Sequence, residues 1–360
     1  MKTLSIISFT FALIIGSCTD DIPSLTDNND GNAEQNNNSD WLIPENEVRD
    51  GGPGKDGIPA IDDPELVSVD ESSWLNDNDL VLGFADRDDI RAYPHPILDW
   101  HEIVNDKTDN HSLAVIYCPL TGTGIGWNRV IDEKETTFGV SGLLYNSNII
   151  PYDRSTDSNW SQLLLKCVNG ELSGENPENY TLIETTWETW KNMYPSSQIL
   201  SKETGYSRSY GSYPYGGYRE DEFLIFSVSN TDSRLHAKER VLCIIENAKA
   251  RAYTFEILSE CNNLIMDNFQ ENKFVVTGNN QKNLMVAFQR VTEDGTALEF
   301  QYLENKLPEI LIDNEGTTWD IFGRAVSGPR KGEQLKAVTQ MMGYWFSFAA
   351  FYPNIEIYPV

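Results

Sequence analysis

RAYPHPILDWHEIVNDKTDNHSLAVIYCPLTGTGIG, residues 91–126, is the stretch from which the fold and the chemistry of this chain are best predicted. It places His101 and Cys118 on either side of a predicted helix-to-strand step. The whole chain has only four histidines and five cysteines. Two reactive side chains this close together therefore mark the first candidate site.

Short elements are predicted in and around this stretch. Residues 81–95 predict a β-hairpin, because an apolar run, an Asp-rich turn and an Arg-Ala-Tyr strand follow one another. Pro96 suits the first turn of a helix, and the apolar side chains of residues 96–106 recur at close to helical spacing. Residues 112–118 predict a strand, and residues 185–195 predict a short helix that ends before a proline.

An internal repeat predicts the architecture. Residues 80–98 match residues 240–258, and the Arg-Ala-Tyr of the first segment recurs in the second at an offset of 160. Three further matches follow in the same order: 127–129 with 288–290, 156–174 with 315–333, and 187–195 with 345–353. We therefore predict an α+β fold of two similar, internally repeated units, each of short strands with one or two helices, packed together.

The predicted boundaries follow from the repeat and from composition. The first unit spans residues 53–198 and carries the candidate site. Residues 199–237 are a Tyr/Gly-rich linking segment, and residues 238–360 are the second, degenerate unit. A chain of 360 residues is long enough for two such units.

The first residues have the features of an export signal. In residues 1–18, MKTLSIISFTFALIIGSC, a short apolar run follows Lys2. The last four resemble the lipobox of bacterial lipoproteins, which implies cleavage before Cys18 and lipidation of that cysteine; an ordinary secretory signal is the alternative. Residues 19–52 are polar, acidic and rich in Asn, which predicts a disordered tether. We therefore expect a lipid anchor in a membrane of the cell envelope, with the protein facing outside the cytoplasm, in the periplasm or at the cell surface.

The net charge of -28 excludes some partners. Binding to nucleic acid requires a basic face that can neutralise phosphates, so no nucleic-acid partner is expected. Electrostatic docking on anionic lipid is disfavoured for the same reason. A solubilising surface is the simplest explanation of the charge.

Cys118 is the predicted nucleophile or redox thiol. It ends a predicted strand and precedes a Gly-rich turn, whose backbone N–H groups can stabilise a thiolate and lower its pKa. His101 is predicted to act as base or orienting partner, with Glu102 beside it as a supporting catalytic group. The alternatives are a buried cysteine that packs as a small hydrophobic residue and a structural histidine. In the second unit, Cys261 and Gly278 stand where the first has His101 and Cys118, so the site is assigned to the first unit; neutral drift at two unimportant positions is the alternative.

A second polar block, residues 143–162, offers hydrogen-bonding side chains for a ligand. The candidates for substrate binding are Tyr145, Asn146, Asp153 and Gln162, which alternatively serve turns and caps. The Tyr/Gly-rich residues 205–222 are a candidate lining for a cleft between the units.

A metal is the alternative to redox chemistry. Thiolate and imidazole suit copper or zinc, so copper binding through Cys118 and His101 stays open. His95 and Glu102 are the candidates for a third ligand. The spacing of the cysteines resembles no zinc motif. Outside the cytoplasm the cysteines after Cys18 could form disulfides, although their even number establishes none.

Five segments taken together resemble a known bacterial family. They are IPAIDDPELVSVDESSWL, RAYPHPILDWHEIVND, YCPLTGTG, FGVSGLLYNSNIIPYDR and NWSQ. From about Gly57 to the C-terminus the chain resembles the DUF3179 domain, a family whose name records an unknown function. Many relatives have Cys-Pro-Leu-Cys where this chain has Cys118-Pro119-Leu120-Thr121, and some are labelled as having selenocysteine in this region.

The resemblance implies thiol or selenol redox chemistry. Thr121 removes the second thiol of the motif, which leaves a monothiol cycle resolved by another thiol or an external reductant. The leading hypothesis is a thiol oxidoreductase of the cell envelope that uses Cys118 with His101 and a protein or small-molecule thiol as partner. The alternatives are a copper-binding protein and a non-catalytic module that binds a glycan or a peptide.

Overall fold

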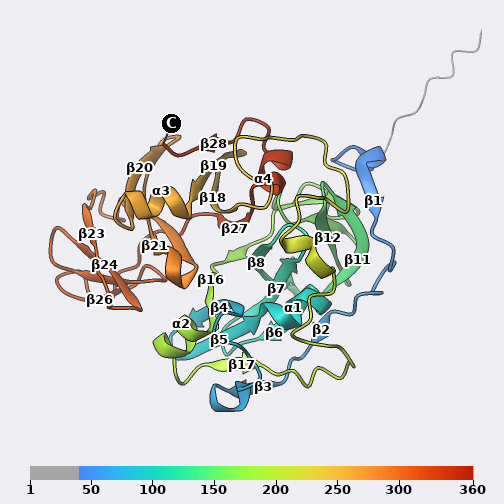
Figure 1. The fold of residues 1–360 in the computed structure, drawn as a ribbon, viewed down its shortest axis with the longest axis horizontal. Helices are drawn as coiled ribbons and strands as arrows, with labels where there is room; N and C mark the ends of the chain where they lie inside the picture. Colours follow the sequence, from blue (N-terminus) through green and yellow to red (C-terminus); the bar gives the residue numbers. More distant parts are fainter. Residues whose placement is uncertain (1–39, 360) are drawn as a thin grey trace, which may run out of the picture. The chain divides into compact units, whose positions relative to one another are not determined.

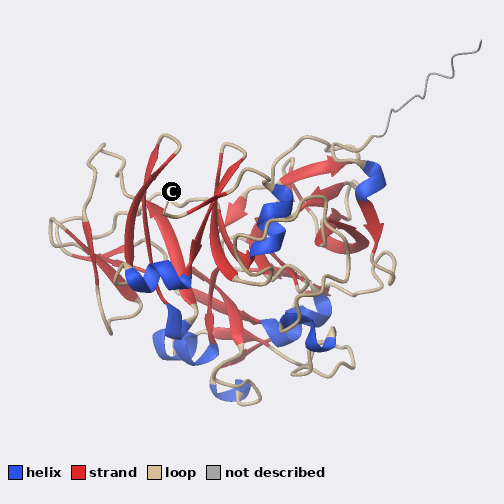
Figure 2. Ribbon diagram, turned by 45° about the horizontal axis from the view of Figure 1, so that its top comes forward, coloured by secondary structure: helices blue, strands red, loops and turns tan. Residues whose placement is uncertain are grey.

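The computed structural model describes residues 40–359, and most of the regular secondary structure in this part is β-strand (Figures 1 and 2). Its helices are short and lie between strands, so the fold is of the α+β class with β-structure dominating. The α-helices are α1 (His95–His101), α2 (Trp187–Met193), α3 (Phe255–Glu260) and α4 (Trp345–Phe351). The 3-10 helices are η1 (Glu45–Glu47), η2 (Asp70–Ser72), η3 (Gly216–Arg219) and η4 (Asn280–Lys282).

The first half of the fold, up to β17, contains three five-stranded sheets. Their strand orders are β16-β4-β5-β17-β3, β15-β8-β7-β6-β2 and β1-β11-β12-β13-β14. A two-stranded ribbon joins β9 (Val130–Ile131) to β10 (Lys134–Glu135). The strands of the three sheets are β1 (Val48–Asp50), β2 (Ile61–Asp62), β3 (Leu66–Ser68), β4 (Leu80–Asp86), β5 (Asp89–Pro94), β6 (Ile103–Lys107), β7 (Ser112–Cys118), β8 (Thr123–Asn128), β11 (Phe138–Tyr145), β12 (Asn148–Asp153), β13 (Asn159–Ser161), β14 (Lys166–Asn169), β15 (Asn179–Tyr180), β16 (Ile183–Thr186) and β17 (Gln198–Leu200).

The second half, from β18 onward, contains three smaller sheets, ordered β27-β18-β19-β28, β20-β21-β22 and β23-β24-β25-β26. Its strands are β18 (Arg240–Glu246), β19 (Lys249–Thr254), β20 (Leu264–Phe269), β21 (Asn272–Asn279), β22 (Leu284–Gln289), β23 (Phe300–Tyr302), β24 (Glu309–Asp313), β25 (Thr318–Asp320), β26 (Ala325–Ser327), β27 (Gln340–Tyr344) and β28 (Glu356–Ile357).

The sheets around β4 and β18 have matching connections. In each, a hairpin (β4–β5 or β18–β19) pairs antiparallel with one outer strand and parallel with the other. A short helix follows the hairpin in both halves. The Arg-Ala-Tyr motifs also make matching contacts: Arg91 and Tyr93 both bind Asp106, at 2.7 and 2.6 Å. The equivalent pair in the second half, Arg251 and Tyr253, both bind Asp267.

The predicted helix over residues 96–106 is wrong in its second part. Helix α1 ends at His101, and Glu102 follows with φ 59°. Residues 103–107 are strand β6, paired antiparallel with β7. Ile103 and Val104 are both fully buried. A strand buried on both faces lacks alternation, and its apolar run cannot be told from a helix by spacing alone.

The predicted signal peptide, the predicted lipidation site Cys18 and most of the predicted tether lie outside the described residues. The last part of that tether, residues 40–52, belongs to the folded part. Strand β1 pairs with β11, with Val48 opposite Tyr145. Ile43 is buried beside Ile150 and Val168. Within residues 40–359 no helix is both long and apolar enough to cross a membrane.

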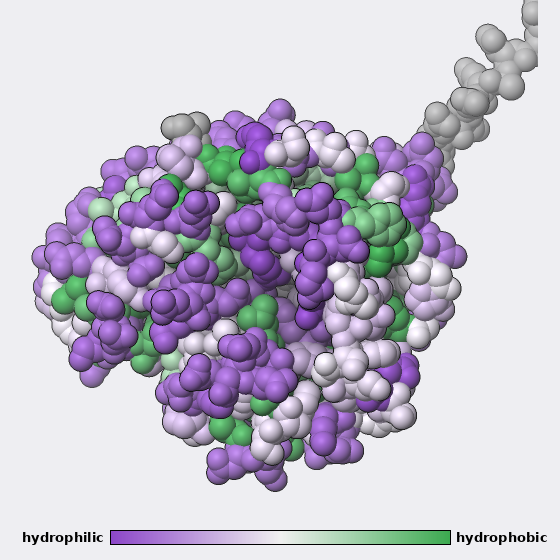
Figure 3. Space-filling model, viewed as in Figure 1, coloured by the Kyte–Doolittle hydropathy of each residue, from purple (hydrophilic) through white to green (hydrophobic). Residues whose placement is uncertain are grey.

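The surface in view is mostly hydrophilic, with hydrophobic side chains in separate small patches (Figure 3). The interior is rich in aromatic rings, as the composition predicts. The largest fully buried side chains include five tryptophans: Trp127, Trp160, Trp190, Trp319 and Trp345. Large rings supply much of the buried apolar area of such a core.

A close backbone contact at Gly278 yields the first testable prediction. Gly278 is the position that the repeat aligns with Cys118, and a Cβ there would lie 2.0 Å from the carbonyl oxygen of Leu284. We expect Gly278→Ala to lower the free energy of unfolding by about 2 kcal/mol or more, because the strands β21 and β22 must separate to admit the methyl group. Urea denaturation measures the change.

The matched control is Gly217→Ala, since a Cβ at Gly217 would meet its nearest atom at 4.0 Å. Its unfolding midpoint should stay close to that of the unmodified chain. Equal midpoints for the two variants would contradict the predicted steric conflict.

Candidate functional site

The turn after Cys118 is fixed by hydrogen bonds to all five of its consecutive carbonyl groups. The Cys118 carbonyl accepts from Gly122 N at 2.8 Å within the turn. The Pro119 and Leu120 carbonyls accept from the hydroxyls of Tyr213 and Tyr218, each at 3.0 Å. The remaining two bonds come from the second half: Tyr344 N donates to Thr121 O at 2.8 Å, and Arg240 Nη1 donates to Gly122 O at 2.9 Å. Three separate parts of the chain therefore hold this turn.

Gly122 is required by this arrangement. Its φ is +63°, and a Cβ there would lie 2.3 Å from Arg240 Nη1. A side chain would therefore displace the guanidinium that binds the turn. The conformation also favours glycine, because other residues rarely adopt a positive φ.

The Cys118 thiol is buried, with 1% of the residue exposed, and it lies 3.6 Å from the carbonyl oxygen of Ser147. Burial raises its pKa to about 11, and the charge of Glu102 acts in the same direction. Thr121 and the backbone of Ile149 oppose this rise through hydrogen bonds. The predicted accessible thiol with a lowered pKa is therefore wrong, because the turn and its neighbours exclude water.

Glu102 is the carboxyl group that acts on Cys118, beside the hydroxyl groups of Tyr213, Tyr215 and Tyr218. Its carbonyl accepts from Tyr117 N at 2.7 Å, which sets Glu102 beside the end of β7. The residue is 6% exposed. Burial raises the pKa of its carboxyl group to about 8, with a smaller rise from Asp99 and an opposing hydrogen bond from Tyr215. Carboxyl and thiol thus share one dry environment.

His101 is not hydrogen-bonded to Cys118. Its Nδ1 lies 2.7 Å from Pro59 O and its Nε2 lies 2.6 Å from the hydroxyl of Tyr210. A carbonyl only accepts, so Nδ1 donates, and Nε2 of the neutral ring accepts from Tyr210. Burial lowers the pKa of His101, which favours this neutral form. The structure therefore brings Glu102 near the thiol and engages both ring nitrogens of His101 elsewhere.

The Tyr/Gly-rich residues 205–222 cover the site, and we call them the cover. In Figure 1 they run beside α1, in yellow. Besides Tyr213 and Tyr218, the cover is held by Arg219, which binds both carboxylate oxygens of the buried Asp99 at 2.6 and 2.8 Å. Trp100 Nε1 also donates to Ser212 O at 3.1 Å. The sequence predicted that residues 205–222 line a cleft between two units. In the structure they form a cap over Cys118 instead.

The four predicted substrate-binding residues lie in internal networks. Asn146 Oδ1 accepts from Ser229 N at 2.7 Å. The Asp153 carboxylate accepts from Trp160 Nε1 and from its own loop. Gln162 is fully buried and bonds the backbone of β7 and β8. Tyr145 packs edge-on against Phe351, with ring centroids 5.2 Å apart. Their binding role stays a prediction, and the contacts match the alternative of turn and core positions.

Metal ligation gains no support from the described residues. Within residues 40–359, no group of three or more His, Cys, Asp or Glu side chains could hold a metal ion. Copper binding through Cys118 and His101 stays a prediction without a third ligand. The cysteines 118, 167, 243 and 261 are all unpaired thiols.

The sequence did not reveal the charged groups that surround the site. His95 Nε2 lies 3.5 Å from Glu184 Oε2, and Glu184 forms a buried ion pair with Arg240 of the second half. Asp99 and Arg219 form the other pair, and burial raises the pKa of Asp99 to about 7. Only the density of tyrosines in the cover signalled that it would pack on something.

Comparison with known proteins identifies a family. The model of a family described as a protein of unknown function (DUF3179) matches residues 55–355. No curated protein matches the chain, and no solved structure matches it. The family match covers most of the chain, which therefore belongs to the DUF3179 family.

The raised pKa of Glu102 predicts how stability depends on pH. Glu102 has a pKa of about 8 in the folded chain and about 4.3 in the unfolded chain. A carboxyl group whose pKa rises on folding stabilises the folded state fully below the unfolded pKa. This stabilisation is lost as the pH rises through the folded pKa. We expect the unfolding free energy to fall by a few kcal/mol from about pH 5 to about pH 9, and Glu102→Gln to reduce that fall. Urea midpoints measured across this range give the result.

The pKa of Asp99 is also raised, so Asp99 too lowers the unfolding free energy as the pH rises. Because Asp99 is present in both the unmodified chain and the Glu102→Gln variant, the difference between their pH profiles reports on Glu102 alone. The same pH dependence in the two proteins would show that Glu102 is not neutral at low pH in the folded chain.

Proposed function

We propose that this member of the DUF3179 family uses Cys118 as the reacting thiol in thiol–disulfide exchange, with Glu102 as the proton acceptor. One comparison carries the proposal. Cys118 and Cys243 are both buried, but burial alone raises the pKa of Cys243. The pKa of Cys118 is also affected by the Glu102 carboxyl group and by hydrogen-bond donors that stabilise the thiolate. Cys167 also has a carboxyl group, Asp153, and a hydroxyl donor, Ser158, among its neighbours, so the distinguishing feature of Cys118 is the buried Glu102, whose pKa is raised to about 8.

The proposed reaction balances in two exchanges. In the ionised form, which becomes the major one above about pH 8, the Glu102 carboxylate takes the proton from Cys118 Sγ, and the thiolate attacks one sulfur of a partner disulfide. A new S–S bond forms to Cys118, and the other partner sulfur leaves as a thiolate. A second thiol, from a protein or a small molecule, then attacks this mixed disulfide and releases Cys118, because Thr121 provides no resolving thiol within the motif.

The cover has to move before a disulfide can reach the sulfur. It is attached by side-chain hydrogen bonds, by the Arg219–Asp99 ion pair and by the buried ring of Tyr218, and Lys238 donates to its backbone carbonyls. Residues 205–222 contain no strand, so this segment opens at less cost than the hydrogen-bonded strands of a core. In this proposal His101 acts as a positioning residue, because its bond to Tyr210 ties α1 to the cover.

Glu102 itself has an unusual backbone. Its φ of 59° and ψ of -34° lie outside the regions that side chains other than glycine commonly adopt. Such conformations persist only where the surroundings enforce them, and they concentrate at functional sites. The turn directs Glu102 toward the end of β7, which supports its assignment as the proton acceptor.

We also infer that the two halves are copies of one unit and that the first copy alone kept the thiol. The inference rests on the matched motifs, the matched strand orders and the contact that excludes a side chain at Gly278. An envelope location with lipid on Cys18 completes the proposal. Disulfides form and persist outside the cytoplasm, so partners would be present there.

Oxidised glutathione tests the proposal with controls inside the same chain. We expect Cys118 to form a mixed disulfide at least about tenfold faster than Cys167 and Cys243, which are also buried thiols with raised pKa values. Glu102→Gln should slow the reaction of Cys118 about tenfold or more and leave that of the partly exposed Cys261 unchanged. Mass spectrometry of peptides from the full-length chain resolves the four sites.

A rate at Cys118 no greater than the rates at Cys167 and Cys243 would disprove the proposal. Arg219→Gln tests the cover separately, because weakening its bond to Asp99 should speed the reaction at Cys118 alone. If Arg219→Gln accelerated all the buried cysteines equally, general loosening of the fold would explain the result.

A further inference from the structure

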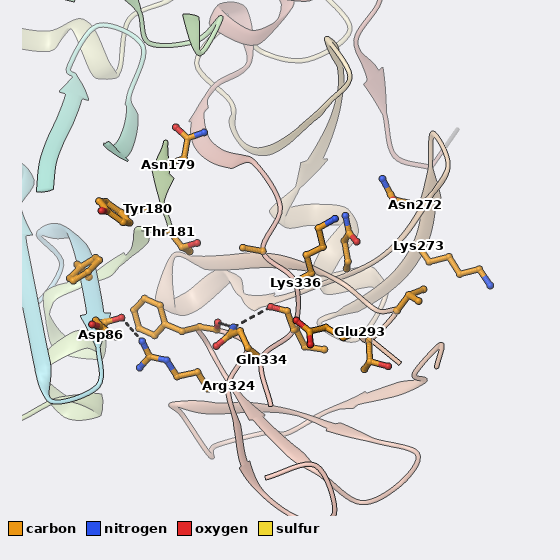
Figure 4. Close-up of a pocket in the computed structure, with 18 of the residues that line it drawn as sticks. Asp86, Asn179, Tyr180, Thr181, Asn272, Lys273, Glu293, Arg324, Gln334 and Lys336 are labelled. Atoms are coloured by element: carbon orange, nitrogen blue, oxygen red, sulfur yellow. Dashed lines mark hydrogen bonds between the residues drawn. The ribbon is translucent and has the colours of Figure 1, made fainter. Parts of the chain in front are cut away.

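A cleft lies between the two halves, away from Cys118. Its volume is about 890 Å³, within the range typical of small-molecule sites. Figure 4 shows Asp86 and the segment from Asn179 to Thr181 on one side, with Gln334 and Lys336 on the other. No residue of the cover and no proposed catalytic residue lines it. The cleft therefore needs its own explanation.

The first-half wall presents an aromatic cluster. Tyr180 lies edge-on to His111, with ring centroids 4.9 Å apart, and to Phe84 at 6.1 Å. Phe84 is buried, whereas Tyr180 and His111 are partly exposed at the cleft. Asn179 and Thr181 flank Tyr180 with an amide and a hydroxyl group. Asp86 lies on the same wall, 3.0 Å from His111 Nε2, so the wall combines ring surface with one carboxylate and with neutral hydrogen-bonding groups.

The second-half wall offers hydrogen-bond donors and a second ring. The Arg324 guanidinium lies over Phe322, 5.3 Å from the ring centroid, and donates to the Ala85 carbonyl across the cleft. Gln334 Nε2 donates to Phe322 O at 2.7 Å, so the side-chain carbonyl oxygen of Gln334 remains available to other partners. Lys336 is exposed at the rim. Arg324 also fixes the two walls relative to each other.

The balanced charge of the cleft lining distinguishes it from the acidic molecule as a whole. Its three acidic residues, Asp86, Glu271 and Glu293, are matched by the three cationic ones, Lys273, Arg324 and Lys336. The chain as a whole carries a net charge of -28. A locally balanced surface on so acidic a protein favours neither anions nor cations, so its occupant should be uncharged and polar.

We propose that this cleft binds a neutral glycan. A sugar ring has an apolar C–H face that packs on an aromatic ring and hydroxyl groups that both donate and accept hydrogen bonds. The cleft supplies Tyr180 for the face and the amides of Asn179 and Gln334 for the hydroxyls. Sites of this kind combine apolar surface with a few placed polar groups.

An adjoining hollow extends the site. It has a volume of about 260 Å³ and shares Asn179, Tyr180, Thr181 and Ala337 with the main cleft. Tyr180 therefore stands where the two hollows meet. A linear oligosaccharide fits this arrangement better than a single sugar, because one residue of the ligand can occupy each hollow with Tyr180 between them.

A peptide is the less suitable occupant. Extended peptides commonly bind by adding a strand to an exposed sheet edge, through repeated backbone hydrogen bonds. The strand β15, which lines the cleft at the edge of its sheet, has only two residues. Asn179 and Thr181, which line the cleft with Tyr180, carry an amide and a hydroxyl group that suit sugar hydroxyls.

Titration of the full-length chain with neutral hexasaccharides of glucose, mannose, xylose and N-acetylglucosamine tests the proposal, with an oligogalacturonate as the anionic probe. We expect saturable binding of at least one neutral probe in calorimetry, largely independent of salt, since no charges are paired. Tyr180→Ala and Asn179→Ala should each weaken it about tenfold. Lys336→Ala, at an exposed position on the other wall, should also weaken it and carries little risk of unfolding.

Tyr206→Ala is the matched control, because Tyr206 is an exposed tyrosine of the cover, outside the cleft. It should leave the affinity unchanged. Three results would overturn the proposal: no binding of any neutral probe, binding that none of the three cleft variants weakens, or tighter binding of the anionic probe. The glutathione reaction of Cys118 is measured separately, so failure of either proposal leaves the other standing.

Discussion

The hydrogen bonding of the turn from Cys118 to Gly122 is the constraint on which the rest of the site depends. A buried carbonyl without a donor is costly, so a turn buried this completely needs a partner for each of its carbonyl groups. Tyrosines of the cover supply two, and Tyr344 and Arg240 of the second half supply two more. The cover and the second half therefore belong to the thiol site, just as the strand that carries Cys118 does.

This dry enclosure explains the acid–base properties of the site. Removing water disfavours both a thiolate and a carboxylate, and it raises the pKa of Cys118 and of Glu102 together. The proton affinity of Glu102 approaches that of the thiol, so transfer between them costs less than it would between a thiol and an exposed carboxylate. The enclosure that slows access to the sulfur thus also raises the proton affinity of its carboxyl neighbour.

Local patterns predicted the hairpin before α1, the strand ending at Cys118, the short helix α2 and the family, because each depends on neighbouring residues. The partner of the thiol could not be predicted in the same way. His101 and Glu102 are adjacent, and which one acts on Cys118 depends on where α1 ends and on the positive φ that follows. The cap formed by Tyr213 and Tyr218 was equally hidden, since contacts between segments this distant leave no periodic signal.

The attachment of Tyr344 to the turn has a consequence for how the protein is made. The donor for the Thr121 carbonyl comes from β27, close to the C-terminal end of the chain. Synthesis runs from the N-terminus, so the sulfur emerges long before the strand that helps to enclose it. Contacts between residues so far apart also form slowly. A newly made chain therefore passes through a period in which Cys118 is open to solvent, and any cell that produces this protein must protect or tolerate that early thiol.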